Sequence, residues 1–511
     1  MTRAGGERLG GAAAPRSIAA NTIFSLVLQG VSSAFTVGLT LFLVRELSPN
    51  DFGLLGLALA IGGLLLLPAE FGIGAATGRY VAQHAADPAA LSEIVGAALA
   101  LKIVLTGLTC LTLGLSAGLI ADVGHVPGLA GPLRAVAVVV FFQSTMNLCL
   151  SIANALGRVD LNLWVILSES LVETGLAVLL VLAGAGAVGA LSARAVAFGA
   201  AAAIGVVIVR RIIPRTAVGW DRPRRLWARR LLGYGGALLV VDSAFALFSQ
   251  IDIVLIAAFL STSAVGAFAA PLRFTVFLML PAGAITSAVA YRLSREDTRQ
   301  EEVGSFVRAI RHVLIIQAFM IAPLLVWAVP ISDVLFGRGR YPDAVGVLRA
   351  LVPFVVLSGL GNLFSLTTNY LGQARRRVPI AIATVIINCA LDVVLIPQLG
   401  VVGGAIGTDI AYGFYAPAHI WICSRILGLT VRPVLRTGLG AAAAAVAMSL
   451  VLAAVGTGHL GVVRLAVGAV LAVLAYGAVI VATGALSRDE RKQLLRRLRP
   501  RRGGSRRLAP E

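Results

Sequence analysis

Long apolar segments that carry almost no charge follow one another along nearly the whole chain. Each segment is long enough for a helix to cross a hydrocarbon core of about 30 Å. Inside a bilayer the backbone must satisfy its own hydrogen bonds, which favours helices. We therefore predict an all-α polytopic membrane protein of about fourteen transmembrane helices. The segments lie at residues 18–44, 52–77, 91–120, 133–156, 161–183, 188–209, 231–259, 264–290, 306–330, 347–371, 378–397, 401–424, 434–455 and 460–486.

Composition excludes an ordinary soluble protein, because 58% of the 511 residues are hydrophobic and only 13% are charged. The formal net charge of +19 does not indicate nucleic-acid binding, because the arginines lie in short segments between apolar runs and in the C-terminal tail. The four cysteines all fall within apolar runs, with no CxxC pair, and the five histidines are scattered. We expect no nucleic-acid partner, no metal site and no cofactor other than a coupling ion.

The basic residues also predict an orientation. If both termini are cytoplasmic, the cytoplasmic segments hold 34 of the 43 Lys and Arg residues. The external segments hold seven, counted generously to include Arg45, Arg134, Arg194, Arg349 and Arg464. This asymmetry follows the positive-inside rule. The last two basic residues, Lys102 and Arg273, lie inside predicted spans. We expect a multi-pass protein of the bacterial cytoplasmic membrane with both ends inside.

The two halves of the chain resemble each other. At an offset of 213 residues, Leu47-Ser48 and Gly53 match Leu260-Ser261 and Gly266, and further pairs follow in order at an offset of 215. We predict a duplicated six-helix unit followed by two extra helices. The predicted parts are a disordered cytoplasmic N-terminus (1–17), an N-lobe (18–209), a basic cytoplasmic linker (210–230), a C-lobe (231–424), two further spans (425–486) and a basic cytoplasmic tail (487–511).

Polar side chains recur at helical spacing within the spans. Asn21 and Gln29 share one face of the first span, Asn362 lies in the tenth span, and Asn388 lies in the eleventh. Alone, each of these residues is most simply a contact between helices. Because the polar faces recur in both halves, we expect them to line a hydrated cavity.

Ionisable residues within the spans point to the same cavity. The nine are Glu70, Lys102, Glu169, Glu173, Asp242, Asp252, Arg273, Asp392 and Asp409. Facing lipid, they would cost on the order of 25 kcal/mol together. They must therefore line a cavity, pair with one another or reach the interface, and structural ion pairs are the main alternative to a cavity. Glu70 and Asp409 lie nearer span ends, where the interface is closer.

The charges permit two chemistries. Arg273 and Lys102 can hold a pyrophosphate. The carboxylates Glu169, Glu173, Asp242, Asp252 and Asp392 can bind sugar hydroxyls, a coupling H⁺ or Na⁺, or a cationic drug. Composition alone does not decide between these two kinds of binding. The tail 488–502 interleaves leucines with basic residues, which predicts either contact with the anionic inner leaflet or a solvated segment.

Three stretches resemble the polysaccharide-transporter branch of the multidrug/oligosaccharidyl-lipid/polysaccharide exporter superfamily. They are LVRELSPNDFGLLGLALAI, FSQIDIVLIAAFLSTSAVGAFAAPLRF and NCALDVVLIPQLGVVGGAIGT. The second stretch carries Asp252, Gly266 and Arg273 at that branch's usual Asp, Gly and Arg. The resemblance covers roughly residues 15 to 485.

The resemblance implies two six-helix lobes that rock around a central cavity. The implied substrate is a polyprenyl-(pyro)phosphate-linked oligosaccharide destined for cell-surface polysaccharide, with its pyrophosphate held by Arg273 and Lys102. Further implied partners are membrane lipids and polysaccharide-assembly proteins. In several relatives a cation gradient is suspected to drive transport.

The function implied in this way is that of a flippase for a lipid-linked oligosaccharide, and two other functions are alternatives to it. A cation-coupled multidrug or small-molecule antiporter of the same fold is disfavoured because the first span lacks a carboxylate. A membrane glycosyltransferase, polymerase or ligase is disfavoured because the longest predicted external loop, near 331–349, offers only Asp333 and Asp343 as acids. We expect no catalytic residues and no enzyme activity.

Overall fold

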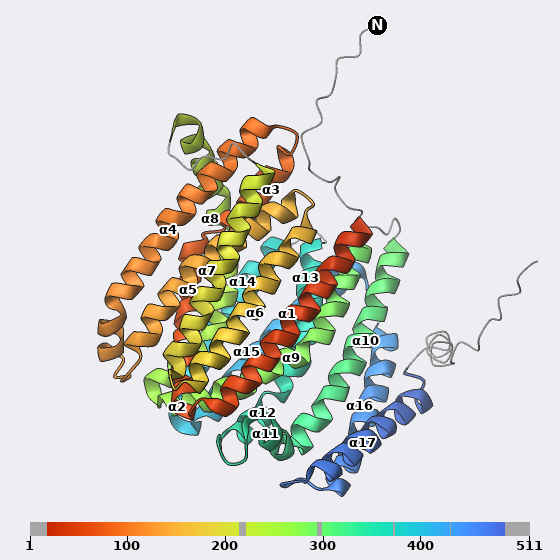
Figure 1. The fold of residues 1–511 in the computed structure, drawn as a ribbon. Coiled ribbons are helices and arrows are strands. Elements are labelled where there is room, and N and C mark those ends of the chain that lie inside the picture. Colours follow the sequence, from red (N-terminus) through yellow and green to blue (C-terminus); the bar gives the residue numbers. More distant parts are fainter. Residues whose placement is uncertain (1–17, 214–220, 294–298, 371–373, 430, 486–511) are drawn as a thin grey trace, which may run out of the picture. The chain divides into compact units, whose positions relative to one another are not determined.

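The computed structural model describes residues 18–213, 221–293, 299–370, 374–429 and 431–485. All of the regular structure in these ranges is helical (Figure 1). The helices are α1 (Ile18–Glu46), α2 (Pro49–Glu70), α3 (Ile73–Gln83), α4 (Pro88–Val123), α5 (Ala130–Ala155), α6 (Val159–Leu182), α7 (Gly186–Ile212), α8 (Arg222–Phe259), α9 (Thr262–Leu293), α10 (Arg299–Val326), α11 (Ala328–Phe336), α12 (Ala344–Ala350), α13 (Val352–Tyr370), η1 (Ala374–Arg376), α14 (Arg377–Leu399), α15 (Val401–Leu427), α16 (Val431–Val455) and α17 (Val462–Ala482).

The prediction of an all-helical, multi-pass membrane protein is confirmed. Among the described helices, fourteen are 19 residues or longer, and each overlaps one of the predicted spans. Ten helices in the described ranges are long and apolar enough to cross a membrane. A bent pair, Ala344–Ala350 with Val352–Thr368, adds an eleventh if it forms one span, with a 42° bend. The other predicted spans correspond to α1, α8 and α15. The predicted N-terminal segment 1–17 and tail 487–511 lie outside the described residues.

The second predicted span, 52–77, is two helices. α2 ends at Glu70, after which Phe71 (φ 42°) and Gly72 (φ 64°) adopt left-handed conformations and α3 begins. A Cβ at position 72 would meet the backbone of Gly235. Hydropathy continues across this point, so the apolar pattern alone did not reveal the break.

The described residues form two compact units. The first contains the chain up to Pro271 together with Leu335–Ala344 and Ala381–Gly407, and the second contains Leu272–Val334, Val345–Ile380 and the chain from Thr408 onward. The boundaries that we predict for the two lobes, the linker and the last two spans remain predictions.

A core of apolar side chains from α3, α4, α5 and α8 holds one end of the first unit together. Ile94 and Leu148 are fully buried in it, and the Trp227 ring packs edge-on to Tyr80. The indole nitrogen of Trp227 donates a hydrogen bond to Glu93 over 3.2 Å. This core fixes the first turns of α8 against α4.

In the second unit, α10, α16 and α17 pack through small residues, including Ala441, Ala444 and Ala472, that let helix backbones approach closely. The Trp327 ring fills the space beside Gly468, and its nitrogen donates to the carbonyl of Leu452 over 3.0 Å.

Helices α2 and α9 cross at two glycines of the sequence repeat. A Cβ on Gly53 would overlap the carbonyl oxygen of Thr262, and a Cβ on Gly266 would overlap the carbonyl oxygen of Pro49. Pro49 and Thr262 are themselves related by the offset of 213 residues. The contact is therefore reciprocal, because each glycine lies against the start of the other helix.

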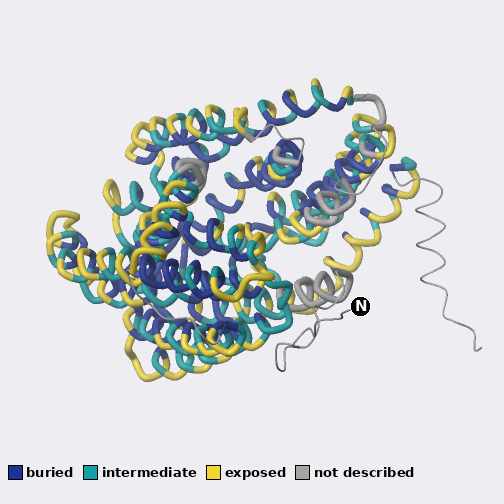
Figure 2. The backbone as a smooth tube through the Cα atoms, turned by 90° about the horizontal axis from the view of Figure 1, so that it is seen from above, coloured by how far each residue is buried: buried dark blue, intermediate teal, exposed yellow. Residues whose placement is uncertain are grey.

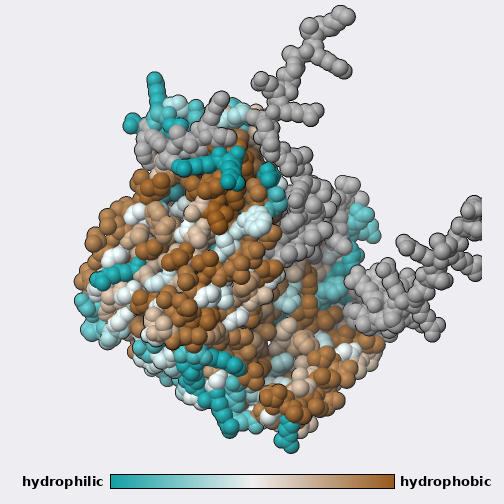
Figure 3. Space-filling view, in the orientation of Figure 1, coloured by the Kyte–Doolittle hydropathy of each residue, from teal (hydrophilic) through white to brown (hydrophobic). Residues whose placement is uncertain are grey.

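Buried and exposed residues both occur along the length of single helices (Figure 2). Along the side of the first unit seen in Figure 3, apolar residues predominate, and hydrophilic residues gather towards its two ends. On α4 an apolar stripe is between 50% and 77% exposed; it consists of Ile103, Val104, Leu108, Leu111, Leu115, Leu119 and Val123. Such a stripe is typical of a surface that faces lipid.

Candidate functional site: a buried acidic cluster

Three predicted site residues meet inside the first unit. Asn388 and Asp392 are four residues apart on α14 and so share one face of that helix. Asp252 comes from α8. The side chains are almost inaccessible, with exposures of 0% for Asn388, 0% for Asp392 and 5% for Asp252.

These residues contact each other directly. The Asn388 amide donates to Oδ2 of Asp392 over 3.1 Å, and the Asp252 carboxyl group lies close to that of Asp392. Within the described part of the chain, Oδ1 of Asn388 and Oδ1 of Asp392 accept no hydrogen bond. Gly407 on α15 leaves room beside Oδ1 of Asp392, because a Cβ at position 407 would overlap that oxygen.

The arrangement is suited to a positive ion. Two touching carboxyl groups removed from water cannot both stay ionised unless a proton or a cation lies with them. Oxygen ligands from carboxylates and an amide are the kind that hard cations prefer. No group of three or more His, Cys, Asp or Glu side chains able to hold a metal ion occurs among the described residues. The cluster instead offers two carboxylates and one amide oxygen.

A second pair of carboxylates lies on α6. Glu169 and Glu173 contact each other, and Oε1 of Glu173 accepts a hydrogen bond from Arg194 over 2.9 Å. Ser170 donates to Glu169 over 3.1 Å. Our count of charges placed Arg194 in an external segment, but it lies within α7. This pair is therefore partly neutralised by a residue that sequence reasoning did not connect with it.

Lys102 takes part in an internal ion pair. Its Nζ lies 2.6 Å from Oε2 of Glu70 and 2.8 Å from Oγ of Ser144. Asn147 donates to the other Glu70 oxygen over 3.1 Å. The Lys102 side chain is 1% exposed, so its charge is directed to Glu70. Ser144 and Asn147 are three residues apart on α5, so both side chains lie on the face of that helix that meets the ion pair.

The other predicted residues are dispersed. Arg273 on α9 is half-buried and has contacts of its own, and Asn362 is exposed on α13. Both belong to the second unit. Asn21 and Gln29 on α1 and Asp242 on α8 lie outside the residues whose side chains are described.

Asp409, the other acid near a span end, caps a helix. Its Oδ1 accepts a hydrogen bond from the backbone N–H of Phe354, in the first turn of α13, over 2.8 Å. Amides of a first turn lack partners within the helix. Because this amide is satisfied by a side chain of α15, no pattern within α13 itself indicated the contact.

Comparison with known families decides the assignment. The family model for polysaccharide biosynthesis proteins matches residues 18–294, which is more than half of the chain. The chain belongs to the polysaccharide biosynthesis protein family. The matched region of this family member contains α1 to α9, so it includes Asp252, the Lys102–Glu70 pair and the Glu169–Glu173 pair.

A curated relative is the "Probable low-salt glycan biosynthesis flippase Agl15" of Haloferax volcanii. It is 24% identical over 400 residues, which cover 77% of this chain and 80% of the relative.

Solved structures show the same fold. The structure titled "Lipid II flippase MurJ, inward closed conformation" superposes with a TM-score of 0.74 at 13% identity and covers 93% of this chain and all of that one. An inward-facing multidrug resistance MATE family transporter of the MOP superfamily gives a TM-score of 0.65 at 17% identity, covering 78% of this chain and 95% of that one. The expected superfamily fold is thereby confirmed.

Proposed function

We propose that this protein is a flippase. It would translocate a polyprenyl-(pyro)phosphate-linked oligosaccharide across the bacterial cytoplasmic membrane by alternating access, for cell-surface polysaccharide biosynthesis. The observation that carries this proposal is membership of the polysaccharide biosynthesis protein family, and a glycan biosynthesis flippase is among its relatives. The protein would carry out binding and movement without making or breaking covalent bonds, and so would have no catalytic residues.

The buried acidic cluster would couple transport to a cation. Asp252, Asn388 and Asp392 would bind H⁺ or Na⁺ in one state and release it in the other, which changes the charge that the buried site must accommodate. Glu169 and Glu173 form a second candidate for the same role. Arg273 would hold the pyrophosphate, whereas Lys102 could do so only by exchanging its present partner Glu70.

A reconstituted assay tests the coupling. Proteoliposomes containing a lipid-linked oligosaccharide are given an inward or outward gradient of H⁺ or of Na⁺, and translocation is measured. We expect one gradient to accelerate translocation in the unmodified protein. Asp392→Asn keeps the shape but removes the carboxylate, so it should abolish the acceleration while leaving slow, gradient-independent flipping. Asp122→Asn, at the exposed end of α4, is the matched control. Full acceleration in Asp392→Asn would remove the cluster from the coupling mechanism.

A cation-coupled multidrug antiporter is the second candidate, because the MATE family transporters share the fold. It would use the same cluster but would export small molecules. Ion-dependent efflux of a cationic drug by the same proteoliposomes, without flipping of the oligosaccharide lipid, would support this function in place of the first.

A further inference from the structure

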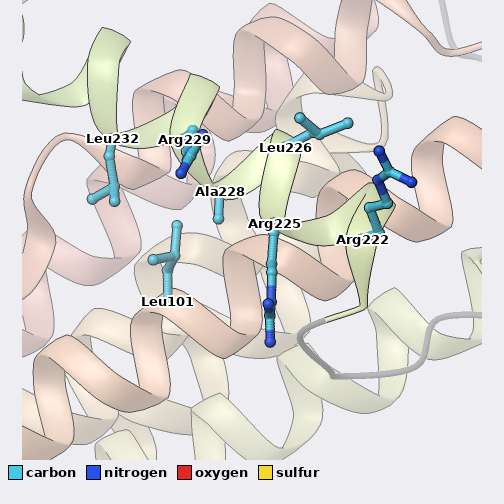
Figure 4. A pocket seen from close by; sticks show the side chains of 7 residues that line it. All are labelled: Leu101, Arg222, Arg225, Leu226, Ala228, Arg229 and Leu232. Carbon is cyan, nitrogen blue, oxygen red and sulfur yellow. The ribbon is translucent and has the colours of Figure 1, made fainter.

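A cleft of about 520 Å³ lies between α4 and the first turns of α8, away from the acidic cluster. Its lining combines guanidinium groups with apolar side chains: Leu101 from α4, and Arg222, Arg225, Leu226, Ala228, Arg229 and Leu232 from α8. In Figure 4, Arg225, Ala228 and Leu232 lie on the side of α8 that faces Leu101. The spacing of 225, 228, 229 and 232 places these residues along one face of the helix.

The charges of the cleft arginines are not neutralised by any residue that the structure describes. Nearby, Arg224 pairs with Asp221 over 2.8 Å, and Arg230 stacks over the Trp227 ring at 4.8 Å from its centroid. By contrast, Arg222, Arg225 and Arg229 form no ion pair with any described residue. The lining includes no carboxylate. The cleft is therefore complementary to an anion.

The exposed stripe on α4 gives the depth of the cleft in the membrane. The stripe runs from Ile103 to Val123, which at 1.5 Å per residue is about 30 Å, the thickness of a hydrocarbon core. N-terminal to the stripe, the apolar residues of α4 are instead buried against α3, α5 and α8. The hydrocarbon region thus begins beside Leu101, and the guanidinium groups lie at the level of the lipid headgroups.

We propose that this cleft binds an anionic phospholipid. Its phosphate would be held by Arg225 and Arg229, with Arg222 at the rim, because guanidinium forks pair well with phosphate oxygens. One acyl chain would lie on Leu101 and Leu232 and continue along the stripe of α4. In the proposed orientation the lipid belongs to the cytoplasmic leaflet. The inference rests on the cleft and the stripe and does not require flippase activity.

Lipid binding by the purified full-length protein tests the proposal. Phosphatidylglycerol and phosphatidylcholine are titrated into detergent-solubilised protein, and bound lipid is counted by native mass spectrometry. We expect the unmodified protein to prefer phosphatidylglycerol. Arg225→Gln with Arg229→Gln should weaken that binding about tenfold or more, since each basic residue near a phosphate contributes on the order of 1 kcal/mol.

The matched control removes the same charge elsewhere. Arg375→Gln with Arg376→Gln changes two exposed arginines of η1 and should leave phosphatidylglycerol binding within about twofold of the unmodified protein. If the α8 double variant does not accumulate, Arg225→Gln is compared with Arg375→Gln, with a loss of about fivefold expected only for the former.

Three results would overturn the proposal. The first is an equal loss of binding in the α8 and η1 variants, which would indicate general charge attraction. The second is that the unmodified protein shows no preference for phosphatidylglycerol. The third is that Arg225 and Arg229 bind only polyprenyl pyrophosphate. The last result would assign the cleft to substrate loading instead.

Discussion

Inside the first unit, Lys102 and Glu70 neutralise each other's charge. Lys102→Met would leave the Glu70 carboxylate and Ser144 without their cation, and we expect a loss of about 2–3 kcal/mol of stability, moderated by the partial exposure of Glu70. Lys102→Met with Glu70→Gln should recover most of that loss, because no uncompensated charge remains. Thermal unfolding in detergent measures both changes.

A different outcome would reassign Lys102. If Lys102→Met is as stable as the unmodified protein, and both variants fail to translocate, then Lys102 holds the substrate and its pairing with Glu70 contributes little to the fold.

Arg273 carries the predicted contact with the pyrophosphate. Arg273→Ala should abolish translocation of a lipid-linked oligosaccharide while the protein still inserts and purifies, because the guanidinium fork that would hold the pyrophosphate is lost. Arg273→Lys should retain part of the activity, since it keeps the charge. Normal translocation by Arg273→Ala in proteoliposomes would exclude Arg273 from the site.

Sequence reasoning identified which residue types lie inside the spans but not their partners. Asp252, Asn388 and Asp392 were each predicted to be functional, yet their meeting depends on the rotation and packing of α8 against α14, which periodicity does not determine. Likewise Arg194, which our charge count grouped with the external segments, lies within α7 and pairs with Glu173. Asp409 caps α13, whose Phe354 precedes it by 55 residues in the chain.

At the level of the elements, the crossing of α2 and α9 gives a direct test of the packing. Gly53→Ala or Gly266→Ala would drive a methyl group into a backbone carbonyl, so either helix must shift. We expect each substitution to cost at least 2 kcal/mol, on the order of a severe overpacking defect. Expression level and thermal unfolding measure the effect.

Gly107→Ala is the control, because Gly107 lies in α4 with open space around the position of a Cβ. It should be neutral or stabilising by up to about 1 kcal/mol, from the helix propensity of alanine. Equal behaviour of Gly53→Ala and Gly107→Ala would contradict the close crossing.

Helix ends were harder to predict than helices. The apolar pattern runs through the α2–α3 break and through the bend between α12 and α13, since both occur within hydrophobic sequence. What stops α2 is a pair of left-handed residues, Phe71 and Gly72, beside Gly235 of another helix. Such a stop is set by tertiary packing.

For the whole molecule, the basic residues predict the orientation, and loop accessibility tests it. A cysteine at Ala86, between α3 and α4, should react with a membrane-impermeant maleimide only after the cells are permeabilised. A cysteine at His125, between α4 and α5, should react in intact cells. Both positions are exposed, and the four native cysteines all lie within helices. Reversed labelling would place the termini outside.

Overall architecture was the most predictable level. Apolar length and the positive-inside asymmetry depend on local composition, which is why the helical membrane fold could be predicted without knowledge of any contact. The grouping of segments into compact units depends on long-range packing. Residues 381–407, far along the chain, belong to the same unit as α2 to α8.

The reciprocal crossing at Gly53 and Gly266 restricts how this protein can evolve. Each glycine makes space for the start of the other helix, so a bulkier residue at either position disturbs the backbone on the opposite side of the contact. A substitution at one side of this contact is therefore constrained by the residues on the other side. Homologues that have lost one of the two glycines should therefore carry a compensating change at the start of the opposite helix, near Thr262 or Pro49.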